Sequence, residues 1–169
     1  SIASRIARAS DALWTNTELH GQWLSKQVGA HVSIQIHPVL STIGEPSAVP
    51  DASDRDLRLT VFGAQSTRHR ALERLPLHAA TLRRHGIAEV LEVGTGAAYT
   101  GRDGSLPVRF LGRMEATELR SLLESSAYGL IDYPSHCLSK SSVYAAYAAH
   151  GCVSLNTAAP ARETDGLKQ

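Results

Sequence analysis

The sequence lacks several features that would each point to a particular class of protein. It has only two cysteines among 169 residues, Cys137 and Cys152, and both lie beside apolar segments. We therefore expect free thiols in a reducing compartment and no disulfide framework. The formal net charge is only +1. This near balance argues against a nucleic-acid partner, because such binding depends on a basic face.

Membrane and metal signals are absent as well. No apolar run approaches the roughly 20 residues that a membrane helix needs, and the opening stretch SIASRIARAS lacks the apolar core of a signal peptide. We therefore expect a cytoplasmic protein without a transmembrane segment. The histidines and cysteines show no zinc-type spacing, and no Ser-His-Asp or Cys-His arrangement is supported, so we predict no metal site. Both ends look cut, which suggests a piece of a longer protein.

What the sequence does contain is a 43 % share of hydrophobic residues, enough for a core, arranged in short runs. The first 40 residues predict a small β/α unit. Its expected elements are a helix at 1–9, a strand at 11–17, a helix at 17–28 and a strand that ends near Pro38. Residues 41–56 are rich in Pro, Gly, Ser and Asp and have almost nothing to bury, so they read as a linker.

After the linker, strand-like and helix-like segments alternate. We expect strands at 57–63, 88–94, 107–114, 129–134 and 152–157, and helices at 66–86 (broken at Pro76), 115–129 and 140–150. Such alternation predicts a Rossmann-like parallel sheet with helices on both faces. This α/β domain would span residues 57–157, with loops 63–68, 112–115 and 136–142 at its carboxyl edge and a polar tail at 158–169.

One segment inside this domain favours a different function. VLEVGTGAAYTG (90–101) resembles the first motif of S-adenosylmethionine-dependent methyltransferases, in which glycines let the backbone approach the ligand. Glu115 stands where an acidic residue would accept ribose hydroxyls. However, Gly101, Gly104 and Pro107 interrupt the helix that should follow the glycine turn. We therefore expect an irregular loop at 97–106 and keep the methyltransferase only as an alternative.

A second resemblance covers most of the chain. The segments that carry it, in order, are VFG (61–63), LEVGTG (91–96), VRFLGRMEATELRSLLESSAYG (108–129), IDYPS (131–135) and YAAYAAHGCVSL (144–155). Their order and spacing resemble the C-terminal nucleotide-binding domain of GT-B glycosyltransferases, in particular the retaining family-4-like enzymes. Residues 1–40 resemble the last unit of the N-terminal GT-B domain, and 41–56 the linker between the two domains.

The resemblance implies a function. The domain would bind a nucleotide diphosphate sugar and transfer its glycosyl group to an acceptor, whether glycan, lipid or protein, that another domain mostly holds. It would be a metal-independent glycosyltransferase whose donor is a substrate, with no further cofactor. The apolar residues Trp14, Trp23 and Leu24 have no sheet of their own to pack in, so we expect them to contact the main domain or a second copy in a homodimer.

The stretch LSKSSVYAAYAAHG (138–151) is the strongest candidate for a phosphate site. Lys140, Ser141 and Ser142 precede an alanine-rich helical segment, and a helix start offers unpaired N–H groups and a partial positive charge. Lysine adds a full charge and serine hydroxyls add donors. The alternative is that the serines only cap the helix. His150, at the other end, is expected to bind helix carbonyls.

The family resemblance extends the site to further residues. It implies that Arg68 and Arg70 contact the diphosphate, that Gly63 lets the backbone approach it, and that His136 touches the donor sugar. It also places Gly112, Arg113 and Met114 against the nucleotide base.

One departure from the family pattern concerns catalysis. Leu138 and Ala146 stand where the family has two glutamates with seven residues between them, and neither side chain accepts a hydrogen bond. A catalytically degenerate GT-B-like module with a binding or structural role therefore remains as an alternative to the active enzyme.

Overall fold

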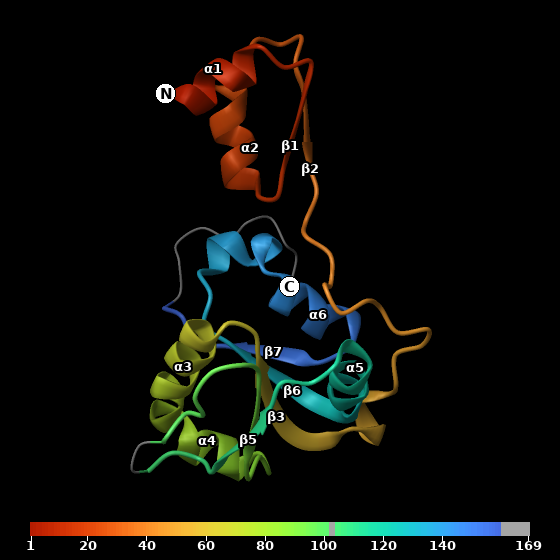
Figure 1. Cartoon of the computed structure of the whole chain (residues 1–169), viewed down its shortest axis with the longest axis vertical. Helices are drawn as coiled ribbons and strands as arrows, with labels where there is room; N and C mark the ends of the chain where they lie inside the picture. Colours follow the sequence, from red (N-terminus) through yellow and green to blue (C-terminus); the bar gives the residue numbers. More distant parts are fainter. Residues whose placement is uncertain (102–103, 160–169) are drawn as a thin grey trace.

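The computed structural model describes residues 1–101 and 104–159, and its main body is a five-stranded sheet (Figure 1). The strands are β3 (Asp56–Phe62), β4 (Val90–Val93), β5 (Val108–Gly112), β6 (Ser126–Ile131) and β7 (Val153–Asn156). Their order is β5-β4-β3-β6-β7, and every neighbouring pair is parallel. The predicted Rossmann-like α/β fold is confirmed.

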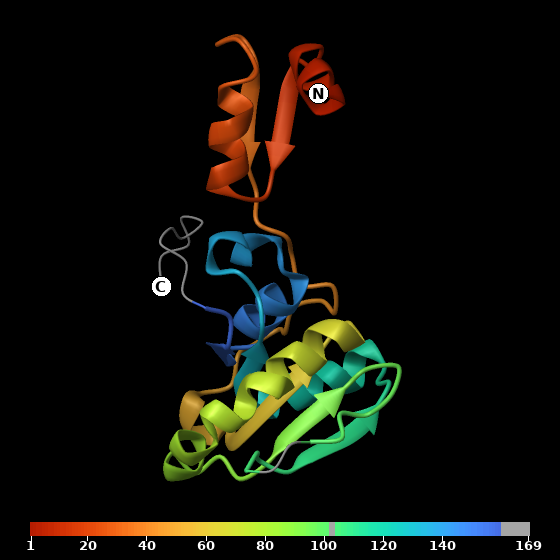
Figure 2. The ribbon, with the colours of Figure 1, turned by 90° about the vertical axis from the view of Figure 1, so that its left-hand side faces the viewer.

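Helices cover both faces of the sheet. One face carries α3 (Gln65–Arg74), the short 3-10 helix η2 (Leu75–Leu77) and α4 (Ala79–Arg84), which lie in front of the strands in Figure 2. The other face carries α5 (Ala116–Ser125) and α6 (Ser142–Ala149). Pro76 lies in η2, so the expected break in the first long helix is confirmed.

The parallel arrangement gathers the connecting loops at one edge. Because all five strands point the same way, the segments that follow β3, β5 and β6 leave from the same carboxyl edge, as predicted. The chain moves from β3 outward to β4 and β5 and then returns to place β6 on the other side of β3. Such a reversal of strand order leaves a crevice between the loops that diverge from β3 and β6.

Two boundaries differ from the sequence expectation. The helix expected at 115–129 ends at Ser125, and β6 begins at once with Ser126 instead of at residue 129. Pairing with β3 decides this boundary, because Ser126 and Tyr128 lie opposite Asp56 and Leu59 and the Ser126 hydroxyl bonds the Thr60 hydroxyl at 2.9 Å. The helix expected at 140–150 begins only at Ser142, after a 3-10 helix η3 (Ser135–Lys140).

The connection between β4 and β5 is irregular, as expected for 97–106. Residues 102–103 lie outside the described part of the chain, and the described residues on either side of them form no helix between Val93 and Val108. Leu106 is buried in the core beneath α3 and α4, and Tyr99 packs against the same cluster. The loop therefore supplies apolar cover that a crossover helix would otherwise give.

The first 40 residues form the small unit expected from their pattern: α1 (Ile2–Arg8), β1 (Ala12–Thr15), α2 (Glu18–Ser25) and β2 (Ser33–Ile36), with β1 and β2 parallel. Figure 1 shows this unit apart from the main body. Trp14 is 77 % exposed and Trp23 42 %. The expectation that these residues have no sheet of their own is wrong, because Trp14 lies in β1 of the two-stranded sheet. Both tryptophans stay exposed in the single chain, and packing on a second copy stays a prediction.

The linker does more than connect. Ile43 packs against the core beneath α5 and α6, and the Val39 N–H donates to the Ser139 carbonyl at 2.9 Å. The only regular element within 41–55 is the 3-10 helix η1 (Ala52–Asp54). The expected polar tail at 158–169 lies outside the described residues from residue 160 onward.

Tyr147 of α6 anchors its helix to the sheet. Its side chain is fully buried, and its hydroxyl lies 2.9 Å from the Thr60 carbonyl oxygen and 3.1 Å from that of Leu130. The ring meets Phe62 edge to face at 5.3 Å and lies directly over Gly129 of β6. A β-carbon at position 129 would overlap the Tyr147 ring, so this strand position requires glycine.

We therefore expect Gly129→Ala to lower the free energy of unfolding by about 1–3 kcal/mol, the usual cost of overpacking a core. Urea denaturation measures the loss. In a Tyr147→Leu background the ring is gone, so the added cost of Gly129→Ala should shrink. Simple additivity of the two substitutions would show that the ring is not the cause.

Cys152 lies in the same core, beside a buried arginine. Its Sγ is 3.1 Å from the Leu123 carbonyl oxygen, and Arg55 donates to the carbonyls of Leu123 and Ser126 at 3.3 and 3.2 Å. Burial raises the pKa of the Cys152 thiol from about 9 to about 11, and the charge and hydrogen bond of Arg55 only partly oppose it. Both cysteines are free thiols, as expected.

This raised pKa predicts a loss of stability in alkali. The folded state holds the thiol proton more tightly than the unfolded chain, so the stabilisation is complete below about pH 9 and disappears as the pH rises towards 11. We expect the free energy of unfolding to fall across this window, and to fall less in Cys152→Ala. Identical pH profiles for the parent and the variant would contradict the assignment.

Candidate functional site

A cavity of about 460 Å³ opens at the carboxyl edge of the sheet, in the crevice where the strand order reverses. Its walls come from the end of β3 and the start of α3, the end of β6, the junction of η3 with α6, one position of α5, and the linker. The lining residues are Thr42, Ile43, Phe62, Gly63, Ala64, Thr67, Leu119, Ile131, Tyr133, Lys140, Ser141, Ser142 and Val143. The cavity therefore unites Gly63 with the predicted Lys-Ser-Ser stretch.

The start of α6 contains both features that the sequence suggested. Ser141 is the N-cap: its hydroxyl accepts from the Tyr144 N–H at 3.1 Å, and its own N–H donates to the Leu138 carbonyl at 2.9 Å. The capping interpretation is thus confirmed for Ser141. Ser142 and Val143 are the first two helical residues, whose N–H groups have no acceptor within a helix. Both residues line the cavity.

Lys140 adds a full positive charge to this helix start. It is exposed, ends η3 and lines the cavity directly before the α6 cap. Within residues 1–101 and 104–159, no carboxylate forms an ion pair with it. An ammonium group without a counter-ion and the positive end of a helix therefore act on the same space, and both favour an anion there.

Gly63 brings β3 close to α6. Its φ is 114°, a conformation that residues with a side chain rarely adopt, and a β-carbon there would lie 3.0 Å from Cγ2 of Val143. The strand end and the helix start are therefore near neighbours across the cavity wall. A larger residue at position 63 would be strained and would crowd the first turn of α6.

Arg68 lies inside the domain, behind the cavity. Its side chain is fully buried, with Nε 3.0 Å from Glu92 Oε1, while its terminal nitrogens donate to the carbonyls of Gly63 and Thr95. Glu92 is also fully buried, and its second oxygen accepts from the Tyr99 N–H at 2.9 Å. Arg68 thus joins the ends of β3 and β4. Its contact with a phosphate stays a prediction, one that requires this ion pair to open.

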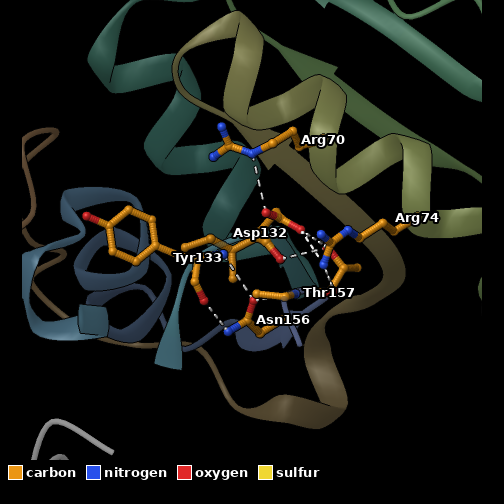
Figure 3. Close-up of polar contacts among 8 residues, drawn as sticks. Arg70, Arg74, Asp132, Tyr133, Asn156 and Thr157 are labelled. Carbon is orange, nitrogen blue, oxygen red and sulfur yellow. Dashed lines mark hydrogen bonds and ion pairs between the residues drawn. The ribbon is translucent and has the colours of Figure 1, made fainter. Parts of the chain in front are cut away.

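A second polar cluster lies at the end of β6 (Figure 3). Asp132 is only 6 % exposed; its two oxygens lie 3.4 Å from Arg70 Nε and 3.3 Å from Arg74 Nη1, and its Oδ2 accepts from the Thr157 hydroxyl at 3.1 Å. Nearby, the Asn156 side chain bonds the N–H and the carbonyl of Tyr133 at 3.1 and 2.7 Å. The sequence analysis named Arg70 but missed Asp132. The feature that could have indicated Asp132 is its position as an acidic residue directly after an apolar strand.

The remaining predicted residues do not line the cavity. Gly112 is the last residue of β5, at the edge of the sheet, and Arg113 and Met114 follow it. The Gly112 carbonyl accepts from the Gly94 N–H at 2.9 Å, and Met114 packs against the core. His136 is half-buried within η3. Their contacts with a base and a sugar stay predictions. His150 does bind a helix carbonyl, that of Ala146, at 2.8 Å, as expected.

No protein-family model and no curated protein matches this chain. Across residues 1–101 and 104–159, no helix is long and apolar enough to cross a membrane. The same residues contain no group of three or more His, Cys, Asp or Glu side chains placed to hold a metal ion. The evidence on function is therefore the fold and the cavity at the reversal of strand order, which Lys140 lines.

The buried ion pair behind the cavity makes a clear stability prediction. Glu92→Gln removes the negative partner and leaves the Arg68 charge buried, so the free energy of unfolding should fall by about 3–5 kcal/mol. Glu89→Gln is the matched control, because the Glu89 side chain is 42 % exposed and pairs with Arg109 at 3.4 Å on the surface. Glu89→Gln should lower the free energy of unfolding by less than about 1 kcal/mol. Equal losses in urea denaturation for the two variants would contradict this account.

Proposed function

We propose that residues 57–157 are the nucleotide-sugar-binding domain of a GT-B-type glycosyltransferase. The observation that carries the proposal is the convergence of Gly63, Lys140 and the start of α6 on one cavity at the point where the strand order reverses. Open parallel α/β sheets bind nucleotides in this crevice, outside the carboxyl ends of their strands. The donor would be a nucleotide diphosphate sugar and the acceptor a glycan, a lipid or a protein.

The cavity suits the leaving group of such a reaction. Glycosyl transfer breaks the bond between the anomeric carbon and a β-phosphate oxygen and forms a bond from that carbon to an acceptor oxygen, so negative charge grows on the departing phosphate. The acceptor hydroxyl gives its proton to this phosphate or to water. In this proposal the Ser142 and Val143 N–H groups and the Lys140 ammonium stabilise that charge. Groups that bind the developing charge more strongly than the intact donor lower the barrier directly.

A second candidate is a binding module without catalysis, and a specific observation favours it. Leu138 and Ala146, at the positions of the family's two glutamates, are 9 % and 0 % exposed, so neither offers a carboxylate to a donor. None of the described residues that line the cavity is Asp or Glu. Incubation with UDP-hexoses and GDP-hexoses separates the candidates, because the enzyme releases free nucleotide diphosphate and the module only binds the donor.

The methyltransferase remains the third candidate and has no comparable observation in its favour. The acidic residue of its glycine-rich motif, Glu92, is enclosed by Arg68 and the Tyr99 N–H. The described residues between β4 and β5 form no helix to cover a bound cofactor. Titration with S-adenosylhomocysteine beside UDP, GDP and dTDP tests this candidate directly.

Lys140→Ala tests the first proposal. We expect it to weaken UDP or GDP binding by about 1–3 kcal/mol, the range for a hydrogen bond to a charged group, with a nearly unchanged melting temperature. Ser141→Ala should do the reverse: loss of the cap lowers stability by about 1 kcal/mol and leaves affinity nearly intact. Calorimetric titration and thermal unfolding measure the two effects.

The matched control is Lys26→Ala, which removes an exposed lysine from the C-cap of α2 in the separate N-terminal unit. It should change neither affinity nor melting temperature appreciably. If Lys140→Ala binds every nucleotide as tightly as the parent protein does, the phosphate role of this helix start is wrong and serine capping is its whole function.

A further inference from the structure

The arginine cluster at the end of β6 lies beside the cavity. Thr67 lines the cavity, and Arg70 and Arg74 follow it at spacings of three and seven residues, on the same side of α3. Asp132, which holds both arginines, stands between Ile131 and Tyr133, two residues that also line the cavity. None of the three side chains lines the cavity itself, so the cluster adjoins it through Thr67, one helical turn before Arg70, whereas Lys140 lines it on the α6 side.

The two arginines are bound differently. Arg74 uses its tip, because Nη1 donates to the Thr157 carbonyl at 2.9 Å and lies 3.3 Å from Asp132. Arg70 contacts Asp132 only through Nε, at 3.4 Å, and 53 % of its side chain is exposed. Among the described residues, neither terminal nitrogen of Arg70 has a hydrogen-bond partner. Figure 3 shows these nitrogens pointing away from Arg74.

The charges in the cluster do not cancel. Two guanidinium groups face one carboxylate, and the Thr157 hydroxyl that also binds Asp132 is neutral. The cluster therefore carries one net positive charge, and Arg70 is the member whose two terminal nitrogens have no hydrogen-bond partner among the described residues. A guanidinium fixed through Nε keeps a planar pair of donors that fits two phosphate oxygens, and fixing it in advance lowers the entropic cost of binding.

We propose that Asp132 is a positioning residue that holds Arg70 at the rim of the cavity, so that its two terminal nitrogens bind the diphosphate of the donor. This inference rests on the proposed function. Arg74 completes the arrangement by neutralising Asp132 and joining it to the end of β7 through Thr157. The diphosphate would thus meet cationic groups from both sides of the crevice.

Asp132→Asn distinguishes positioning from simple electrostatics. If only charge mattered, removal of a carboxylate near an anion site would tighten anion binding. If Asp132 positions Arg70, its loss frees that side chain and binding weakens instead. Asparagine has nearly the same shape and still accepts from the Thr157 hydroxyl, so the change is largely confined to charge.

The experiment titrates the full chain with UDP, GDP and inorganic pyrophosphate. We expect Arg70→Gln to weaken binding about tenfold, as for loss of one charge-assisted contact, and Asp132→Asn to weaken it about three- to tenfold. The double variant should bind no more weakly than Arg70→Gln alone, because Asp132 acts through Arg70. The controls are Arg109→Gln and Asp56→Asn, both exposed charges outside the carboxyl-edge loops.

The outcomes separate the inference from the function beneath it. If the parent binds and Asp132→Asn binds equally well or more tightly, or if the two losses simply add, the positioning role is overturned and the proposed function stands. If the parent binds none of the probes, both fall. Should Asp132→Asn fail to fold, Arg70→Lys decides, because it keeps the charge but loses the planar fork: affinity equal to the parent's overturns the inference.

Discussion

The buried ion pair between Arg68 and Glu92 holds the end of β3, which forms one wall of the cavity, against the neighbouring end of β4. Arg68 comes from α3, Glu92 from β4, and the same guanidinium also binds the carbonyls of Gly63 and Thr95. Two unpaired charges in this position would cost several kcal/mol each. The pair therefore favours a single arrangement of the loops after β3 and β4. The hydrogen bond from Arg68 to the Gly63 carbonyl also stabilises the positive-φ turn at Gly63.

The polar groups at the start of α6 fall into two kinds, those bonded within the domain and those that only line the cavity. Ser141 serves the helix, since its hydroxyl and N–H are both used within the domain. Lys140 and Ser142 are next to it in sequence and line the cavity. A similar contrast holds beside the cavity: the tip of Arg74 is bound, whereas the terminal nitrogens of Arg70 have no partner among the described residues.

The sequence predicted the parallel sheet because short apolar runs alternating with amphipathic helices leave few other arrangements. The sequence predicted the end of α5 less well, since SSAYG at 125–129 is compatible with a helix. Pairing with Leu59 and Thr60 of β3 is what makes residues 126–129 part of β6. The position of Lys140–Ser142 at a helix start could be predicted, because a helix start is formed by residues that are neighbours in sequence. The contact of Asp132 could not, because its partner Arg70 is 62 residues away and charge alone does not reveal such a contact.

The two units of the chain differ in their aromatic residues. Trp14 and Trp23, the two tryptophans of the sequence, both lie in the N-terminal unit, while all five tyrosines lie between residues 99 and 147 of the main body. Light at the long-wavelength edge of the absorption band, which tryptophan absorbs and tyrosine does not, therefore excites only the small unit, whose indoles are in contact with water. Tryptophan emission reports on that unit alone, and tyrosine signals report on the sheet domain, so the behaviour of each can be followed in the intact chain without attaching a dye.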